Sequence, residues 1–305
     1  MSPRRPDADV PPGLLLVDKA SGMTSHDVVA RARRALSVRK VGHAGTLDPM
    51  ATGLLILGVG TATRLLGYVG GHDKTYEATI RFGQATVTDD REGEVIATTS
   101  AAHVDDAAVR SVLAAQTGAL EQVPSSVSAV KVAGRRSYDR VRAGETVELA
   151  PRSVTVHRLD VHRITRPAAD LIDVDVTVSC TAGTYIRAIA RDAGAALGVG
   201  GHLTALRRTA SGPFTVDEAA PVEEAAAALV AGGGVGFLAL PEAATTVFPS
   251  RALSDEEARA LFHGQRIPVT GTPGLHAALG HDGRLVALVE DAGPTARVAV
   301  GFPAS

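Results

Sequence analysis

The chain's clearest candidate for chemistry is a carboxylate in a glycine-rich stretch. Asp48 lies within Gly42-His-Ala-Gly-Thr-Leu-Asp-Pro-Met-Ala-Thr-Gly53, whose glycines allow sharp turns and close approach of the backbone to a ligand. An Asp-Pro pair is also an ordinary signal for a turn or a helix start. His43 and two threonines share the stretch, and the basic pair Arg39-Lys40 precedes it. A polar loop of this kind between apolar runs is more typical of a site than of a spacer.

The elements on either side of this loop can be predicted from local patterns. Gly13–Asp18 and Gly53–Gly60 are apolar runs that predict buried strands. Thr24 and Asp27 fit a capping box, which predicts the start of a helix. Apolar residues then recur at helical spacing, with arginines between them. The loop is therefore expected to be positioned by buried strands and by a helix with one apolar and one basic face.

The rest of the chain mixes long strands with scattered helices. Thr75–Phe82, Ser153–Ile164 and Leu171–Cys180 have the residues of strands. Asp105–Gln116 and Thr184–Leu197 have helical spacing and are closed by Gly118 and Gly198. Strands and helices do not alternate strictly, so the pattern favours an α+β fold over a doubly wound one. The run from Asp89 to Gly93 is typical of a turn.

A small second domain is expected at the C-terminal end. The alanine- and glycine-rich stretch Ala225–Gly236 marks a change in composition, and Ser254 with Glu257 then forms a second capping box. Strand-like runs follow at Leu285–Glu290 and Ala296–Gly301. We therefore expect a tail at residues 1–12, a main domain at 13–243 and a small domain at 250–303.

Composition excludes several classes of protein. The single cysteine, Cys180, excludes an internal disulfide and a multi-cysteine metal site. No apolar run approaches the roughly 20 residues that span a bilayer, and no secretory signal opens the chain, so we expect a cytoplasmic protein. The formal net charge is −2, yet basic residues gather in two places, which fits either solvated faces or phosphate binding. These patches are Arg31, Arg33, Arg34, Arg39 and Lys40, and then Lys131, Arg135, Arg136, Arg140 and Arg142.

Four further motifs follow the glycine-rich loop around Asp48, in order between Lys74 and Arg208. They are Lys74-Thr-Tyr-Glu-Ala78, then Val123 to Lys131 continued by Gly134 to Asp139, then Gly183-Thr-Tyr-Ile-Arg187, and finally Gly201 to Arg208. Together with the loop, these five motifs in register resemble those of the bacterial tRNA pseudouridine-55 synthases, the TruB family, whose signature loop the Asp48 loop resembles. The resemblance as a whole runs from about Gly13 to Phe214.

The resemblance implies a fold and an activity. It implies the pseudouridine synthase fold, a mixed and largely antiparallel central sheet with flanking helices, followed by a small β-rich PUA-like RNA-binding domain. It implies isomerisation of uridine 55 in the T arm of tRNA, with tRNA as partner, no protein partner, and a monomer. The glycosidic bond is broken and the uracil rejoined through carbon 5 without net redox change, so neither cofactor nor metal is expected. A carboxylate serves such chemistry as a nucleophile or by stabilising a cationic sugar.

The resemblance also implies roles for individual residues. Asp48 is the catalytic carboxylate, Arg187 holds its charge, and Tyr76 stacks on the extruded uracil. Tyr185 and Leu206 are pocket walls, and His43 contacts the flipped nucleotide. Lys19, Arg64 and Lys131 are candidates for phosphate contacts. By local pattern alone, Arg187 could also be a surface arginine, Tyr76 a core tyrosine and His43 a packing histidine. Whether Asp48 attacks the base or the sugar is open.

One departure from the family pattern lies after Phe82-Gly-Gln84. The run Thr86-Val-Thr-Asp-Asp90 has Val87 where the family usually has an acid, while Asp90 matches the later acid. Other functions also fit a chain of this kind. They are a pseudouridine synthase acting on another RNA, a module that binds and refolds the T arm without catalysis, and a hydrolytic N-glycosidase that releases uracil.

Overall fold

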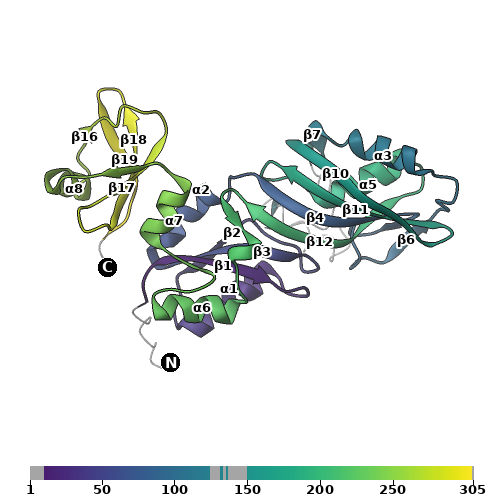
Figure 1. Cartoon of the computed structure of the whole chain (residues 1–305), viewed down its shortest axis with the longest axis horizontal. Helices are drawn as coiled ribbons and strands as arrows, with labels where there is room; N and C mark the ends of the chain where they lie inside the picture. Colours follow the sequence, from purple (N-terminus) through teal and green to yellow (C-terminus); the bar gives the residue numbers. More distant parts are fainter. Residues whose placement is uncertain (1–9, 124–130, 133–134, 137–149, 304–305) are drawn as a thin grey trace.

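A large mixed sheet forms the centre of the chain, whose computed structural model describes residues 10–123, 131–132, 135–136 and 150–303 (Figure 1). Eight strands follow one another in the order β14-β1-β3-β12-β4-β11-β10-β7, β2 pairs with β3, and β13 pairs with β12. All these pairs are antiparallel except β3 with β12. The predicted α+β class is thus confirmed. The strands are β1 Gly13–Lys19, β2 Val41–Ala44, β3 Thr52–Val59, β4 Lys74–Phe82, β7 Gly118–Gln122, β10 Arg152–Ala168, β11 Leu171–Cys180, β12 Gly201–Ser211, β13 Phe214–Thr215 and β14 Phe237–Ala239.

Helices cover one face of this sheet. They are α1 Ser25–Leu36, α3 Asp106–Ala114, α5 Ile186–Ala196 and α6 Val222–Ala231. Their apolar side chains share one core with every second residue of the central strands, such as Ile80 and Phe82 of β4 and Val176 of β11. The intervening residues, such as Thr79 and Arg81, lie on the opposite face and are only partly buried. This alternation is the reason that one face of β4 can line a site while the other meets solvent.

Local capping signals set the helix ends as predicted. Thr24 caps α1, where its hydroxyl accepts from Asp27 N at 3.1 Å and the Asp27 carboxylate accepts from Thr24 N at 2.8 Å. Ser254 and Glu257 form the same box before α8 Asp255–Phe262. The short elements of the main unit are η1 Gly60–Leu65, α2 Leu66–Val69, β5 Gln84–Thr86, β6 Val95–Thr98, β8 Lys131–Val132, β9 Arg135–Arg136 and η2 Val216–Glu218.

A second sheet of five strands lies at the C-terminal end (Figure 1). Its order is β15-β17-β18-β19-β16, and the predicted strand-like runs fall in β18 and β19. It packs through α7 Leu240–Val247 on the face of β1 and β3 opposite α1 and α6, and Leu54, Ile56, Leu288 and Phe302 belong to this shared core. The strands are β15 Ser250–Ala252, β16 Ile267–Pro268, β17 Leu275–Leu279, β18 Leu285–Ala292 and β19 Thr295–Gly301.

Two stretches have roles that their composition did not indicate. Most of the alanine-rich stretch forms α6, which packs against α1 and β1, and β14 then adds a strand to the main sheet. The run from Asp89 to Gly93, expected as a plain turn, carries the buried Asp90, which bridges to Leu203 of β12. Within the described residues, no helix combines the length and apolar character needed to cross a membrane. Residues 1–9 of the expected tail lie outside the described residues.

Candidate active site

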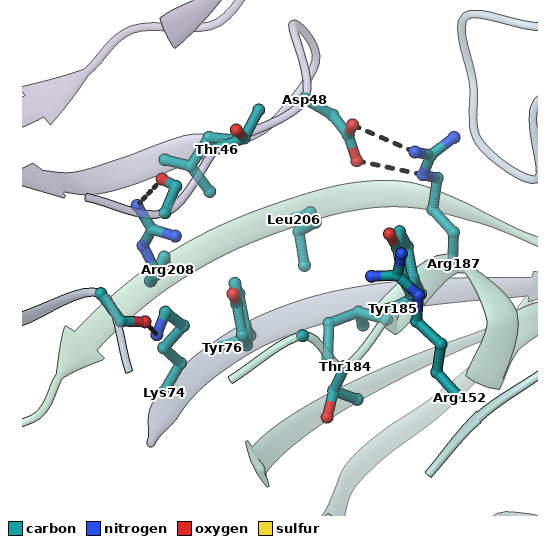
Figure 2. A pocket seen from close by; sticks show the side chains of 15 residues that line it. Thr46, Asp48, Lys74, Tyr76, Arg152, Thr184, Tyr185, Arg187, Leu206 and Arg208 are labelled. Atoms are coloured by element: carbon teal, nitrogen blue, oxygen red, sulfur yellow. Dashed lines mark hydrogen bonds and ion pairs between the residues drawn. The ribbon is translucent and has the colours of Figure 1, made fainter. Parts of the chain in front are cut away.

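A pocket of about 440 Å³ opens on the helix-covered side of the main sheet, between the Asp48 loop and the start of α5 (Figure 2). Its floor is formed by β4 and β12, which are neighbours in the sheet. Five residues predicted for the site line it, namely Asp48, Tyr76, Tyr185, Arg187 and Leu206. The complete lining is Gly45, Thr46, Leu47, Asp48, Gly70, Lys74, Tyr76, Arg152, Gly183, Thr184, Tyr185, Ile186, Arg187, Leu206 and Arg208.

The loop that carries Asp48 is held at several points by the rest of the chain. The Ser25 hydroxyl, at the first turn of α1, accepts from Leu47 N at 2.9 Å and donates to Leu47 O at 3.3 Å. Gly22 N and the Lys19 ammonium both donate to Pro49 O, at 2.8 and 3.2 Å. These bonds fix the backbone on both sides of Asp48.

Lys19, one of the predicted candidates for a phosphate contact, lies inside the fold. Its side chain is buried, and its ammonium donates to Met23 O at 2.7 Å and to Ala20 O at 3.0 Å as well as to Pro49 O. An ammonium has three donors, and these carbonyls use all of them. Burial lowers the pKa of Lys19 to about 8. Its role is to tie the chain before α1 to the Asp48 loop.

Glycine is required where this loop joins β3. Gly53 has a φ of +95°, and a Cβ added there would lie 2.2 Å from the carbonyl oxygen of Arg208 on β12. The parallel pairing of β3 with β12 brings the two backbones together at this point. The glycine-rich character of the motif thus allows the loop to turn directly over β12.

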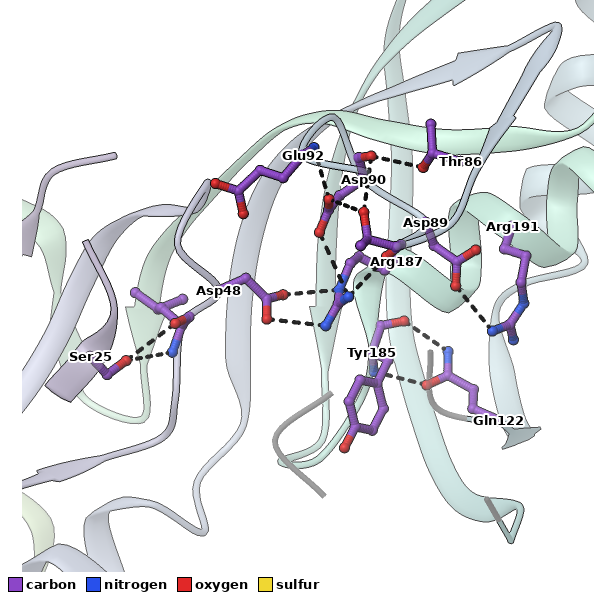
Figure 3. Close-up of polar contacts among 12 residues, drawn as sticks. Ser25, Asp48, Thr86, Asp89, Asp90, Glu92, Gln122, Tyr185, Arg187 and Arg191 are labelled. Carbon is purple, nitrogen blue, oxygen red and sulfur yellow. Dashed lines mark hydrogen bonds and ion pairs between the residues drawn. The ribbon is translucent and has the colours of Figure 1, made fainter. Parts of the chain in front are cut away.

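Asp48 and Arg187 form a two-point ion pair inside the pocket (Figures 2 and 3). The Arg187 Nε lies 3.0 Å from Asp48 Oδ2, and its Nη2 lies 3.1 Å from Oδ1. The Arg187 side chain is 5% exposed and that of Asp48 is 32% exposed. Both side chains line the pocket, but the Asp48 carboxylate is the more exposed of the two, so a ligand there would meet the acid more readily than the base.

Arg187 is itself held from behind by the segment after β5 (Figure 3). Its Nη1 donates to Thr88 O at 2.9 Å and lies 3.6 Å from Asp90 Oδ2. Asp90 is 3% exposed, and its other oxygen accepts from the Thr88 hydroxyl and from Glu92 N at 3.0 Å. Two carboxylates therefore share one guanidinium. Asp90 was missing from our predicted site, although its match to the family's later acid was a signal; Val87, in place of the usual first acid, is exposed.

Opposing influences act on the charge of Asp48. Burial raises the pKa of this carboxyl, the Arg187 guanidinium opposes the rise, and the nearby Asp90 carboxylate adds to it. A bidentate guanidinium strongly favours the ionised form of a carboxylate. The site thus contains an anion that is partly desolvated and matched by one buried cation.

Tyr76 and Leu206 form the apolar part of the floor, and Tyr185 forms a wall. Tyr76 and Leu206 are each 7% exposed. Gln122 of β7 brackets the Tyr185 backbone, where its Oε1 accepts from Tyr185 N at 2.9 Å and its Nε2 donates to Tyr185 O at 3.3 Å. Sequence patterns contained no signal for Gln122. Gln122 connects the edge strand β7 to Tyr185, the residue just before α5 begins at Ile186.

Three other predicted residues lie outside the pocket lining. His43 is on β2, and its ring makes an edge-to-face contact with His26 of α1, with centroids 5.3 Å apart. Arg64 is on η1, is exposed, and donates to Gly301 O of the C-terminal sheet. Lys131 belongs to β8, but its side chain and most of the predicted RNA-facing segment lie outside the described residues.

The pocket offers no obvious metal-binding set. Among the residues that the structure describes, no group of three or more histidine, cysteine, aspartate or glutamate side chains is arranged to hold a metal ion. Cys180 is buried in the core with a free thiol. The chemistry available at the pocket is that of an anionic carboxylate, an aromatic floor and several cations.

Three family models match consecutive parts of the chain. The model described as "TruB family pseudouridylate synthase (N terminal domain)" matches residues 33–186. The model for the tRNA pseudouridylate synthase B C-terminal domain matches residues 187–232. The model described as "tRNA Pseudouridine synthase II, C terminal" matches residues 248–303. The matches therefore cover both the pocket and the C-terminal sheet.

Whole-chain relatives and solved structures agree with these matches. A tRNA pseudouridine synthase B of Arthrobacter sp. (strain FB24) is 55% identical over 304 residues, covering 96% of this chain and 97% of the relative. One from Thermobifida fusca (strain YX) is 53% identical over 296 residues, covering 96% and 99%. A solved structure titled as a Cbf5-Nop10-Gar1 complex superposes with a TM-score of 0.69 at 26% identity, covering 95% of this chain and 85% of that one.

Proposed function

The chain belongs to the TruB family of pseudouridylate synthases, and on that premise we propose that it converts uridine 55 in the T arm of tRNA to pseudouridine with Asp48 as catalytic carboxylate. Its relatives are named as tRNA pseudouridine synthases. We further propose that it works in the cytoplasm as a single chain.

The reaction needs an anion next to the glycosidic bond. The bond between C1′ and N1 breaks, the uracil turns, a new bond forms between C1′ and C5, the proton on C5 is lost, and N1 gains a proton. An ionised Asp48 can add to the base or to the sugar, and each role requires the charge that the Arg187 guanidinium stabilises at 3.0 Å. The observation that carries the proposal is this two-point pair at the wall of a pocket large enough for a nucleoside.

The apolar floor suits a base taken out of its stack. Tyr76 supplies an aromatic face, and stacking of a splayed base on such a face is worth about 1–3 kcal/mol. Leu206 lies next to it on β12 and closes the floor. Burial raises the pKa of the Tyr76 phenol, so it is neutral in the free enzyme. We assign it to hold the base and to lie near the proton that leaves C5.

Turnover on a T-arm stem-loop RNA tests the proposal. The product is a uridine isomer of unchanged mass, which carbodiimide labelling detects at the single position 55. A hairpin with cytidine at that position is the matched control. Release of free uracil would identify a hydrolytic glycosidase, and RNA binding without any isomer would identify a folding module; either result contradicts the proposal.

A further inference from the structure

Two buried cations line the end of the pocket that the proposed chemistry leaves unused. Lys74 opens β4, Arg208 lies on β12, and their exposed fractions are 6% and 1%. Figure 2 shows both on the side of Tyr76 away from Asp48 and Arg187. The register of the sheet explains the grouping, since Arg208 pairs with Tyr76 across the strands and Lys74 lies two residues before Tyr76 on the same face.

Neither cation forms an ion pair with a carboxylate in the described part of the chain. The Lys74 ammonium donates to Gly70 O at 2.9 Å and to His72 O at 2.6 Å. The Arg208 guanidinium donates through Nε to Leu54 O at 2.7 Å and through Nη2 to Gly45 O at 3.0 Å. These four acceptors are neutral carbonyls, and no ion pair within 4 Å joins either side chain to a described carboxylate. Each cation also retains donors beyond these bonds.

Gly45 leaves the two cations open to the pocket. A Cβ added at this glycine would lie 3.2 Å from Arg208 Nη1 and 3.4 Å from Lys74 Cε. The absence of a side chain here keeps both cationic groups within reach of a ligand. Burial of positive charge is unfavourable unless an anion compensates it. Accordingly, burial, with a further contribution from Arg208, lowers the pKa of Lys74 to about 8.

We propose that Lys74 and Arg208 bind a backbone phosphate of the substrate RNA next to the uridine that enters the pocket. This inference rests on the proposed function. A phosphate carries a full negative charge before any bond breaks, and its oxygens accept several charged donors at once. A uracil oxygen is neutral in the bound substrate, so it would leave the buried charge of the free site largely uncompensated. The position of Lys74 and Arg208 beyond Tyr76 fits the chain that continues from the stacked nucleotide.

The test removes the charge from one partner at a time. All binding is measured with the full chain carrying Asp48→Asn, so that the RNA is not converted. Four hairpins are compared: unmodified, methylphosphonate at the linkage before the target uridine, methylphosphonate at the linkage after it, and methylphosphonate at a remote stem linkage. The enzyme variants are Lys74→Gln, Lys74→Arg and, as a matched loss of one exposed cation, Arg110→Gln on α3.

One flanking methylphosphonate should weaken binding by roughly tenfold when Lys74 is present, because one charge-assisted contact is lost. Lys74→Gln should bind this methylphosphonate hairpin less than about twofold more weakly than it binds the unmodified hairpin. Lys74→Arg and Arg110→Gln should keep the tenfold loss of affinity for the flanking methylphosphonate. The methylphosphonate in the stem should change the affinity of every variant by the same factor. The phosphate site is overturned if neither flanking linkage matters, or if Lys74→Gln shows the same loss as its parent. Lys74→Arg, which keeps the charge, also reports on the site if Lys74→Gln does not fold.

The pH dependence of binding provides a second readout. Around Lys74, Arg208 on β12 disfavours its charge and Asp73 beside it favours it, while Cys180 on β11 would favour it only as a thiolate. Burial raises the pKa of Cys180 to about 11, so this thiol stays neutral below pH 9. A bound phosphate favours charged Lys74, so affinity should fall as the pH rises from 7 to 9. Lys74→Arg should show no such fall, and an equal fall in that variant would contradict the site.

The outcomes separate this inference from the proposed function. Absence of pseudouridine from the wild-type chain with unmodified hairpin contradicts the proposed function. Normal isomerisation combined with methylphosphonate effects that do not depend on Lys74 contradicts the phosphate site alone. Turnover is measured with Lys74→Gln in the chain that keeps Asp48. If this variant has a lower turnover at saturating RNA, and the loss is equal for every hairpin, Lys74 would be assigned to the uracil, and the phosphate site would be overturned.

Discussion

At the scale of single residues, the reaction depends on keeping one desolvated carboxyl ionised. Burial and the neighbouring Asp90 raise the pKa of Asp48, while Arg187 opposes them. When the pKa of an acid is higher in the folded chain than in the unfolded chain, ionisation of that acid makes the folded chain less stable. The charge of Asp48 is therefore held at a cost to folding at neutral pH, which is common for functional groups.

Asp48→Asn tests this directly. Asparagine keeps the size and serves about as well as aspartate at turns and caps, but it cannot act as an anion. We expect normal folding, an equal or slightly higher melting temperature, retained RNA binding, and turnover lower by a factor on the order of a thousand or more. Thermal melting and T-arm turnover are measured on one preparation. Near wild-type turnover would remove Asp48 from the mechanism.

The pH profile gives a second test at this scale. Asp48 must be ionised, so activity should fall as the pH drops, and the raised pKa places this fall above the range of an ordinary aspartate. Arg187→Lys keeps the charge but loses the two parallel donors, so the fall should move to higher pH and turnover should drop roughly 10- to 100-fold. The measurement is kcat/KM against pH. Arg163→Lys, at an exposed arginine that pairs with Asp175, is the control that should leave the profile unchanged.

At the scale of elements, the site is assembled where a loop, the start of a helix and an edge strand meet. The Asp48 loop is tied to the first turn of α1 through Ser25, and Arg187 is the second residue of α5. Gln122 joins β7 to the backbone just before α5. The start of α5 is thus fixed by a side chain from another element, because Tyr185 itself provides no capping side chain.

Gln122→Leu should loosen this junction. The substitution leaves Tyr185 N without its acceptor, while Tyr185 O still accepts from Ala188 N at 3.1 Å. The lost partner of Tyr185 N should cost about 1–3 kcal/mol of folding free energy. Because Arg187 lies two residues further on, turnover should fall as well, though far less than in Asp48→Asn. Chemical denaturation and T-arm turnover measure the two effects. Gln265→Leu, at an exposed position after α8, is the matched control, and equal behaviour of the two variants would show that the Gln122 contacts are unimportant.

At the scale of the whole molecule, the two sheets share one core. Apolar side chains of β1 and β3 pack against α7 and against β17, β18 and the end of the chain. A cut after Ala243 would fall inside α7, at a fully buried residue. The C-terminal sheet is therefore expected to contribute to the stability of the main unit in addition to any contact with RNA.

Leu288→Ala tests this coupling. Leu288 is fully buried in the shared core, so the truncation should cost about 2–5 kcal/mol. Calorimetry should show one unfolding transition in the wild-type chain and one transition at lower temperature in the variant. Val235→Ala, at a position 65% exposed, should leave the transition in place. A separate early transition in Leu288→Ala, with the main transition unchanged, would show that the two units unfold independently.

The sequence by itself determined the class of fold, most elements and the family. Leu171–Cys180 alternates strictly and forms β11 between these same residues, and both capping boxes set their helices. These features depend on neighbours within about four residues, which local patterns report directly. The motifs around Asp48, Tyr76 and Arg187 likewise identified three side chains that line one pocket.

Only the tertiary structure decided which charges meet in that pocket. Arg187 is 139 residues from Asp48 and 99 from Thr88 along the chain, and Gln122 is 63 residues from Tyr185. The same long-range packing turned Lys19 toward three carbonyls and left Lys74 and Arg208 facing the pocket. The spacing of residues in a strand or helix gives the face on which a side chain lies. Which distant group shares that face depends on strand order and register, because these set the burial and the partners that fix each charge.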